Sequence, residues 1–156
     1  MRRTRLVFAT AVASLAAGVG LARSHTAEFD LHATLDSRQE VPKAPHPVAR
    51  ASGVFTGMVD RETRTVTWKL VYEGLSGRPT AAEIRVGKPG AIGPVALRLC
   101  GPRAAAGRTR CQSGVHGVAT FGPRTMAAFF AGYTYVNVHT SKNPTGEIRG
   151  QILTMR

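Results

Sequence analysis

The sequence predicts an all-β domain, a sandwich or barrel of about eight antiparallel strands. Apolar and polar residues alternate with a period of two over most of the chain after residue 25, which is the pattern of half-buried strands. Turns that carry glycine and proline separate these segments, and the totals of 17 glycines and 9 prolines fit many turns. Helical periodicity is limited to one short candidate at 124–131, which Gly132 would close.

The alternating segments follow one another along the chain. Residues 51–73 read as a hairpin around a polar turn, and Trp68 within it is expected to pack in the core. Residues 41–50 hold three prolines and are predicted to form a loop or extended connection. The remaining strands are expected at 29–35, 80–86, 93–100, 114–121, 133–140 and 146–155.

Residues 1–24 have the composition of a secretory signal peptide. Three arginines lie within the first five residues, an apolar run covers 6–22, and small residues stand where a signal peptidase inspects the chain. We therefore expect cleavage after Ser24 and a mature domain of 25–156. Cleavage after Ala22 and an uncleaved anchor are the alternatives. The protein is expected to be exported to the periplasm, the cell surface or the medium.

Export changes the net charge. The full chain carries a formal charge of +12, and residues 1–24 hold four of its 21 basic residues and none of its nine acidic ones, which leaves +8. This charge favours an anionic polysaccharide or surface, or an unknown protein, as the partner. The favoured interpretation, however, is a basic surface that only keeps the protein soluble. Nucleic acid is not expected, because the basic residues are scattered apart from a modest cluster at Arg98, Arg103, Arg108 and Arg110. No segment after the signal is long and apolar enough to cross a membrane.

Cys100 and Cys111 are the two cysteines of the chain. In an oxidising compartment an even pair predicts a disulfide. A metal-binding pair is disfavoured because no His, Asp or Glu lies between them, and a redox dithiol is disfavoured because the spacing differs from Cys-x-x-Cys.

Four segments together resemble the CHRD domain, which was named for its repeats in chordin. They are HATLDSRQEVP (32–42), SGVFTGMVDRETRTVTWKLVYEGLSG (52–77), TAAEIRVGKPGAIGPV (80–95) and YVNVHTSKNPTGEIRGQI (135–152). The resemblance implies an immunoglobulin-like, Greek-key β-sandwich, related in shape to copper/zinc superoxide dismutase. It implies little about activity, since fold alone does not supply function.

One departure from the family pattern bears on metal binding. The family commonly reads Ala-His-Ile-His where this chain has Glu83 and Arg85 at the histidine positions. Two histidines there would share a face with His139 and offer three imidazoles to copper or zinc. Glu83 and His139 keep ligating groups, whereas the guanidinium of Arg85 repels a cation. If His25 becomes the mature N-terminus, its amino group and ring are a further candidate copper chelate.

The favoured alternative is a charge ladder of Glu83, Arg85, Glu147 and Arg149 across neighbouring strands, each pair stabilising by roughly 0.2–1 kcal/mol. No catalytic motif stands out, so an enzyme is not the leading prediction. We expect a non-catalytic binding or structural module. A copper- or zinc-binding protein that uses His139 and His25 is the alternative.

Overall fold

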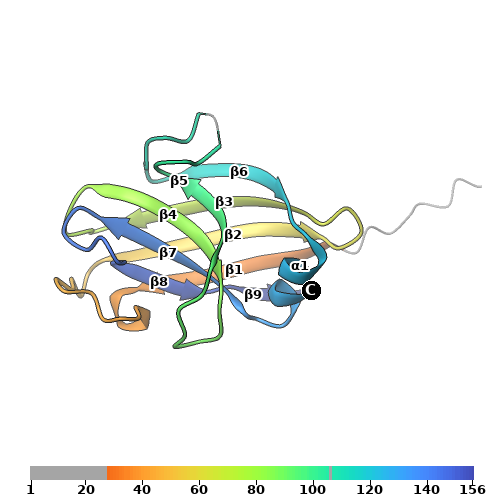
Figure 1. Ribbon diagram of the computed structural model, residues 1–156, viewed down its shortest axis with the longest axis horizontal. Coiled ribbons are helices and arrows are strands. Elements are labelled where there is room, and N and C mark those ends of the chain that lie inside the picture. The colour runs from red at the N-terminus through yellow and green to blue at the C-terminus, as the bar shows by residue number, and fades with distance from the viewer. Residues whose placement is uncertain (1–27, 106) are drawn as a thin grey trace, which may run out of the picture.

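The computed structural model describes residues 28–105 and 107–156, so the predicted signal peptide and His25 lie outside the described part of the chain. This part contains nine strands, one α-helix and one 3-10 turn (Figure 1). The strands are β1 (Glu28–Asp36), β2 (Ser52–Asp60), β3 (Thr65–Glu73), β4 (Pro79–Val86), β5 (Val95–Cys100), β6 (Val115–Thr120), β7 (Thr134–Thr140), β8 (Ile148–Gln151) and β9 (Leu153–Met155); the helices are η1 (Ser37–Gln39) and α1 (Pro123–Phe130).

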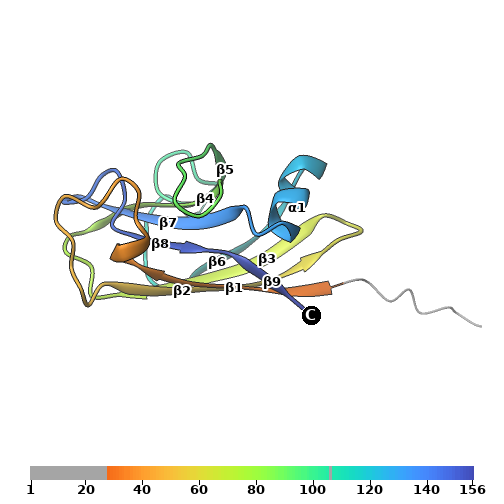
Figure 2. The same cartoon turned by 90° about the horizontal axis from the view of Figure 1, so that it is seen from below.

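All nine strands belong to one antiparallel sheet with the order β5-β4-β7-β8-β1-β2-β3-β6, and β9 pairs with β1. The sheet folds over on itself, so that the layer of β1, β2 and β3 faces the layer of β4 and β7 (Figure 2). The edge strands β5 and β6 come close to each other and leave a nearly closed barrel. The all-β class is therefore confirmed, while the immunoglobulin-like arrangement and the superoxide-dismutase-like shape stay predictions.

The predicted hairpin at 51–73 forms β2 and β3, paired from Ser52 with Glu73 to Asp60 with Thr65. The predicted segment 146–155 divides in two, which makes nine strands where the sequence indicated eight. Its first part, β8, pairs with β7 on one side and with β1 on the other, and its second part, β9, pairs with β1. The strand is interrupted at Ile152, whose N–H donates to the carbonyl of Thr134 at the start of β7, at 2.8 Å.

The predicted helix is present as α1, one residue earlier than expected. Pro123 occupies its first turn, where the missing N–H costs no hydrogen bond. Gly132 follows the helix with φ +69°, the left-handed conformation that ends many helices. In Figure 2 the helix covers one end of the barrel, and Phe129 packs edge-on against Phe121 with ring centroids 5.2 Å apart.

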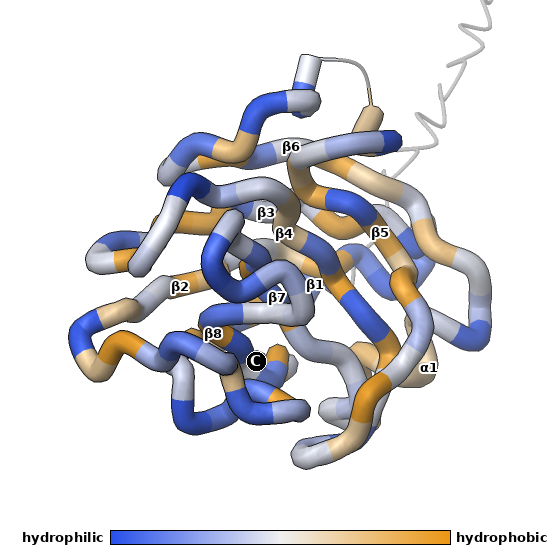
Figure 3. The backbone as a smooth tube through the Cα atoms, turned by 60° about the vertical axis from the view of Figure 1, so that its left-hand side comes forward, coloured by the Kyte–Doolittle hydropathy of each residue, from blue (hydrophilic) through white to orange (hydrophobic). Residues whose placement is uncertain are grey.

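The apolar core lies between the two layers. Trp68 is 4% exposed and belongs to it, as predicted, and its ring contacts Gly117 on the neighbouring strand, where a side chain would collide with it. Hydrophobic and hydrophilic residues follow one another along the strands (Figure 3). The core side chains include Leu31, Leu35, Phe55, Val59, Val66, Leu70, Ile84, Leu99, Val136, Val138 and Ile148.

A second buried layer covers the opposite face of β4, β7 and β8, and this layer is polar. Glu83, Tyr135, Asn137 and Arg149 alternate with core residues along their strands, yet none is more than 4% exposed. Loops cover them: the segment after η1 supplies Glu40 to Asn137, and the loop between β4 and β5 supplies carbonyl and amide groups to Arg149 and Tyr135. The polar layer holds the candidate site.

Candidate functional site

The sequence-predicted residues Glu83 and Arg85 meet His139 in the structure, and Arg98 joins them. Glu83 and Arg85 are two residues apart on β4 and so share a face of the sheet. His139 lies on β7 opposite Ala81, one step along that face. Arg98 lies on β5 opposite Glu83.

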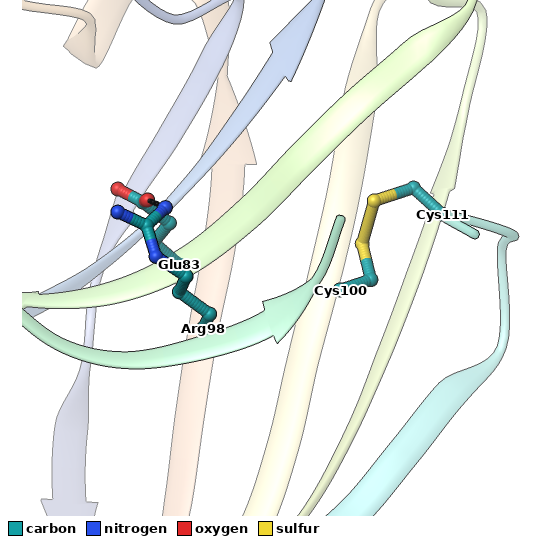
Figure 4. The surroundings of a disulfide bond; sticks show 4 residues. All are labelled: Glu83, Arg98, Cys100 and Cys111. Carbon is teal, nitrogen blue, oxygen red and sulfur yellow. Dashed lines mark hydrogen bonds and ion pairs between the residues drawn. A yellow bond between two sulfur atoms is a disulfide. The ribbon is translucent and has the colours of Figure 1, made fainter. Parts of the chain in front are cut away.

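A β-bulge in β5 determines where Arg98 points. Cys100 pairs with Ala82 and Arg98 pairs with Glu83, although Ala82 and Glu83 are neighbours with opposite faces. The extra residue in β5 therefore turns Arg98 to the polar face while Cys100 stays in the core. Figure 4 shows the Arg98 guanidinium against the Glu83 carboxylate, with the disulfide at the end of β5.

Glu83 organises the site because it accepts two guanidinium groups at once. Arg85 Nη1 donates to Oε2 at 2.7 Å and Arg98 Nη1 donates to Oε1. The Glu83 side chain is 4% exposed. Burial alone raises its pKa, but the neighbouring His139 and the charges of Arg98 and Arg85 outweigh burial, so the pKa of this carboxyl lies below its ordinary value. The carboxylate is therefore ionised and fixed.

His139 has one nitrogen committed and one facing Glu83. Nδ1 lies 3.0 Å from the carbonyl oxygen of Pro144, so Nδ1 carries the hydrogen and donates it. Nε2 lies 3.6 Å from Oε2 of Glu83 and has no hydrogen-bond partner among the described residues. When Nε2 is protonated, it forms an ion pair with Glu83.

These side chains line a cavity of about 290 Å³, which we call the Glu83 pocket. Three guanidinium groups, one imidazole and a single carboxylate face this cavity. Besides Glu83, the residues that matter most to it are Arg85, Arg98, Pro102, Arg103, His139 and Pro144. The lining is therefore positively charged, with two proline rings that offer apolar contact.

The Glu83 pocket fits a metal poorly. A Zn²⁺ ion between His139 Nε2 and Glu83 Oε2 would need about 2.0–2.2 Å to each, but both Glu83 oxygens accept hydrogen bonds from guanidinium groups. Among residues 28–105 and 107–156, no three His, Cys, Asp or Glu side chains gather around a point that could hold an ion. His25, the other predicted copper ligand, lies outside this range.

The disulfide between Cys100 and Cys111 is present. It joins the end of β5 to the connection that leads to β6, at the seam where the two sheet edges meet. In the described part of the chain, no helix has the length and apolar character needed to span a membrane.

The fold and the Glu83 pocket lie within a segment that matches a known protein family. The model of the CHRD domain matches residues 31–152, which is most of the chain. The chain belongs to the CHRD domain family. No curated protein and no solved structure matches it.

In this CHRD domain the terminal motif stabilises the fold and does not form the predicted ladder. The polar part of YVNVHTSKNPTGEIRGQI splits into two groups, and Glu147 belongs to the first. Its carboxylate is fully buried and accepts hydrogen bonds from Ser76 N and Oγ, from Thr140 Oγ1 and from Asn143 Nδ2, at 2.5–2.9 Å. It makes no contact with Arg85, because it lies in the turn before β8, where strand alternation does not constrain its direction.

Asn143 extends this group to a third loop. Its Oδ1 accepts from His46 N at 2.8 Å and its Nδ2 donates to His46 O at 3.1 Å. Asn143 and Glu147 thus hold together the loops at 41–51, 74–78 and 140–147. Nothing in the local sequence pattern indicates His46 or Ser76 as partners of Asn143.

Arg149 belongs to the second group, in the polar layer. Its guanidinium lies 3.6 Å from the centre of the Tyr135 ring, and its Nη2 donates to the carbonyl of Lys88. Beside it, Glu40 Oε1 accepts from Asn137 Nδ2 at 3.0 Å. The ladder therefore reduces to Glu83 and Arg85, with Arg98 as the second cation, while Arg149 is held by an aromatic ring and a carbonyl.

Proposed function

We propose that this CHRD domain is an exported, non-catalytic binding module and that the Glu83 pocket recognises an anionic group on its partner. One observation carries the proposal: a buried carboxylate fixes two guanidinium groups at the wall of a cavity that also faces Arg103 and His139. Cations fixed before binding lose little side-chain freedom when an anion arrives. A planar guanidinium matches carboxylate and sulfate oxygens.

The chemistry of the lining favours an acidic sugar. Pro102 and Pro144 offer apolar surface to the C–H faces of a sugar ring, and Thr80 offers a hydroxyl. The volume, about 290 Å³, is at the lower limit of ligand pockets and suits a small unit of a longer chain. Glu83 is poorly suited to act as a general acid, because its lowered pKa and two guanidinium partners keep it ionised.

The proposal is tested by titrating the purified protein with galacturonic acid and with a sulfated monosaccharide, by calorimetry. Arg98→Gln should weaken binding about 10-fold or more, because hydrogen bonds to charged groups contribute about 1.5–3 kcal/mol. Since Arg98→Gln also removes a partner of Glu83, Arg103→Gln serves as the second variant. Arg103 is exposed, and its replacement should weaken binding about 2- to 5-fold.

Arg50→Gln is the matched control, an exposed arginine outside the Glu83 pocket, and should leave affinity within experimental error. Equal losses in all three variants would mean that only net charge matters and would contradict the proposal.

A copper- or zinc-binding protein is the second candidate, favoured by the approach of His139 Nε2 to Glu83 Oε2 at 3.6 Å. The same preparation separates the two candidates. A metal that binds the folded state raises the melting temperature as its concentration rises. A rise with copper or zinc that disappears in His139→Ala would favour the metal site over the anion site.

A further inference from the structure

A second basic cavity lies on the connection between β5 and β6, close in sequence to part of the Glu83 pocket. It has a volume of about 370 Å³, and we call it the Arg108 pocket after its best-held cation. The lining residues that bear on its chemistry are Arg108, Arg110, Gln112, Ser113 and His116. The Glu83 pocket takes Arg98, Pro102 and Arg103 from β5 and the start of the same connection. Both cavities therefore use the segment that the disulfide closes.

The Arg108 pocket differs from the Glu83 pocket in its charge balance. No Asp or Glu is among the described residues that line it, so its two guanidinium groups face the cavity without a local counter-charge. Neither arginine forms an ion pair within the described chain. An anion that entered would therefore have no carboxylate to displace.

Arg108 is held in place by the barrel. Its guanidinium carbon lies 5.5 Å from the centre of the Trp68 ring, within the range of a cation–π contact. Its Nε is buried and has no hydrogen-bond partner among the described residues. Gly117, opposite Trp68 on β6, leaves room for this approach: a side chain there would come within 3.1 Å of Arg108 Nη1.

Neutral hydrogen-bonding groups complete the cavity. Ser113 Oγ accepts from Tyr72 N at 2.9 Å, which fixes the oxygen and leaves the hydroxyl hydrogen free to donate. Gln112 and His116 add an amide and an imidazole. Two guanidinium groups with hydroxyl and amide donors fit an anionic sugar unit, as in the Glu83 pocket.

We propose that the two pockets bind charged units of the same acidic polysaccharide chain. This inference rests on the proposed function and adds the form of its ligand: a polymer that carries carboxylate or sulfate at intervals. Once one unit is bound, the second binds at a high local concentration, so a chain long enough to reach both pockets binds more tightly than a single unit. A flat anionic membrane is a weaker fit, because the exposed apolar residues Met58, Val118 and Leu153 lie on the sheet and do not line either pocket.

The test measures affinity against chain length. The full protein is titrated with galacturonic acid oligomers from one unit to about ten units, at fixed ionic strength, and with sulfated galactan oligomers of the same lengths. We expect affinity per chain to rise by 10-fold or more once the chain spans both pockets. The double variant Arg108→Gln, Arg110→Gln should lose this rise and keep the affinity of the Glu83 pocket for a single unit.

The double variant Arg50→Gln, Arg124→Gln is the matched control, because it removes two exposed arginines and the same charge. It should keep the rise. If Arg108→Gln, Arg110→Gln also keeps the rise while its circular dichroism and disulfide are unchanged, the inference is overturned. Binding to phosphatidylglycerol vesicles without any length effect of oligomers would overturn it as well.

The two proposals fail in different ways. A single unit that does not bind, or binds equally well to Arg98→Gln, refutes the function proposed for the Glu83 pocket. Long oligomers that bind only through Arg108 and Arg110, with no loss in Arg98→Gln, leave one anion site and refute the two-pocket inference. The comparison of carboxylated with sulfated oligomers identifies which acidic group the pockets accept.

Discussion

At the scale of single residues, Gly146 shows why the terminal motif needs its glycine. Its φ is +137°, a backbone conformation that side chains rarely adopt. A Cβ at this position would come within 2.6 Å of the Glu40 carboxyl group and 2.7 Å of Asn137 Oδ1. The absence of a side chain thus lets the turn before β8 close over the buried Glu40–Asn137 hydrogen bond.

We predict that Gly146→Ala destabilises the domain by about 3 kcal/mol or more, because backbone strain and a steric clash with Glu40 add together. Gly90→Ala is the matched control. Gly90 also has a positive φ, of +75°, but nothing lies within 4 Å of a Cβ there, so this change should cost only about 1–2 kcal/mol. Urea unfolding at neutral pH measures both. Equal losses would show that contact with Glu40 is unimportant.

At the scale of elements, β5 combines an edge position, a bulge and a covalent link. The bulge turns Arg98 outward to Glu83 and keeps Cys100 in the core. The disulfide then ties the end of β5 to the connection that contributes residues to both pockets. One element therefore positions part of the Glu83 pocket and anchors the start of the Arg108 pocket.

The double change Cys100→Ala, Cys111→Ala should lower the free energy of unfolding by about 2–3 kcal/mol, from the loop-closure entropy of a ring of this size. Alanine is used because Cys100 is fully buried and a serine hydroxyl there would lack a partner. Reductant should destabilise the unchanged protein by a similar amount and leave the double variant unaffected. If the double variant unfolds at the same urea concentration as the unchanged protein, the connection is held by other contacts.

The elements that could be predicted from the sequence are those governed by local pattern. Period-two alternation places the strands, and Gly132 marks the end of the one helix. The division at Ile152 could not be predicted, because it depends on where the pairing with β7 ends.

The site was predictable only in part. Alternation on β4 and β7 brings Glu83, Arg85 and His139 to one face, as predicted. Arg98 was missed as a partner of Glu83 because a bulge turns its side chain to the opposite face of the sheet. Glu147 was assigned to the wrong group because its contacts, Ser76 above all, come from distant loops.

At the scale of the whole molecule, three buried carboxylates respond to pH in opposite directions. Burial raises the pKa of Glu147, but hydrogen bonds from Thr140, Ser76 and Asn143 outweigh it, and the pKa is lowered from its ordinary 4.5. The pKa of Glu83 is also lowered. Burial raises the pKa of Glu40 above 4.5 against the hydrogen bonds from Val41 and Asn137.

The signs of these shifts predict the pH dependence of stability. The contributions of Glu83 and Glu147 are fully present above pH 4.5 and are lost as the pH falls through their lowered pKa values. Glu40 acts in reverse, since its ionisation in the folded state costs stability as the pH rises above 4.5. We expect the free energy of unfolding to fall as the pH drops below about 4.5.

Urea unfolding between neutral pH and about pH 3 measures this slope. Glu147→Gln should be less stable at neutral pH and should show a shallower fall in acid. Glu40→Gln is the opposing control and should show a steeper fall. A slope unchanged in both variants would place the acid sensitivity in other carboxyl groups.

The nearly closed sheet has a consequence for crowded conditions. Strand edges that face solvent invite pairing with another chain, and proteins commonly protect them with charge or with covering loops. In this domain the two edge strands lie close to each other, and the segment that joins them carries a disulfide and several arginines. An incoming strand would have to displace that segment and overcome repulsion between like charges. Many copies could therefore be concentrated on one polymer without forming intermolecular sheets.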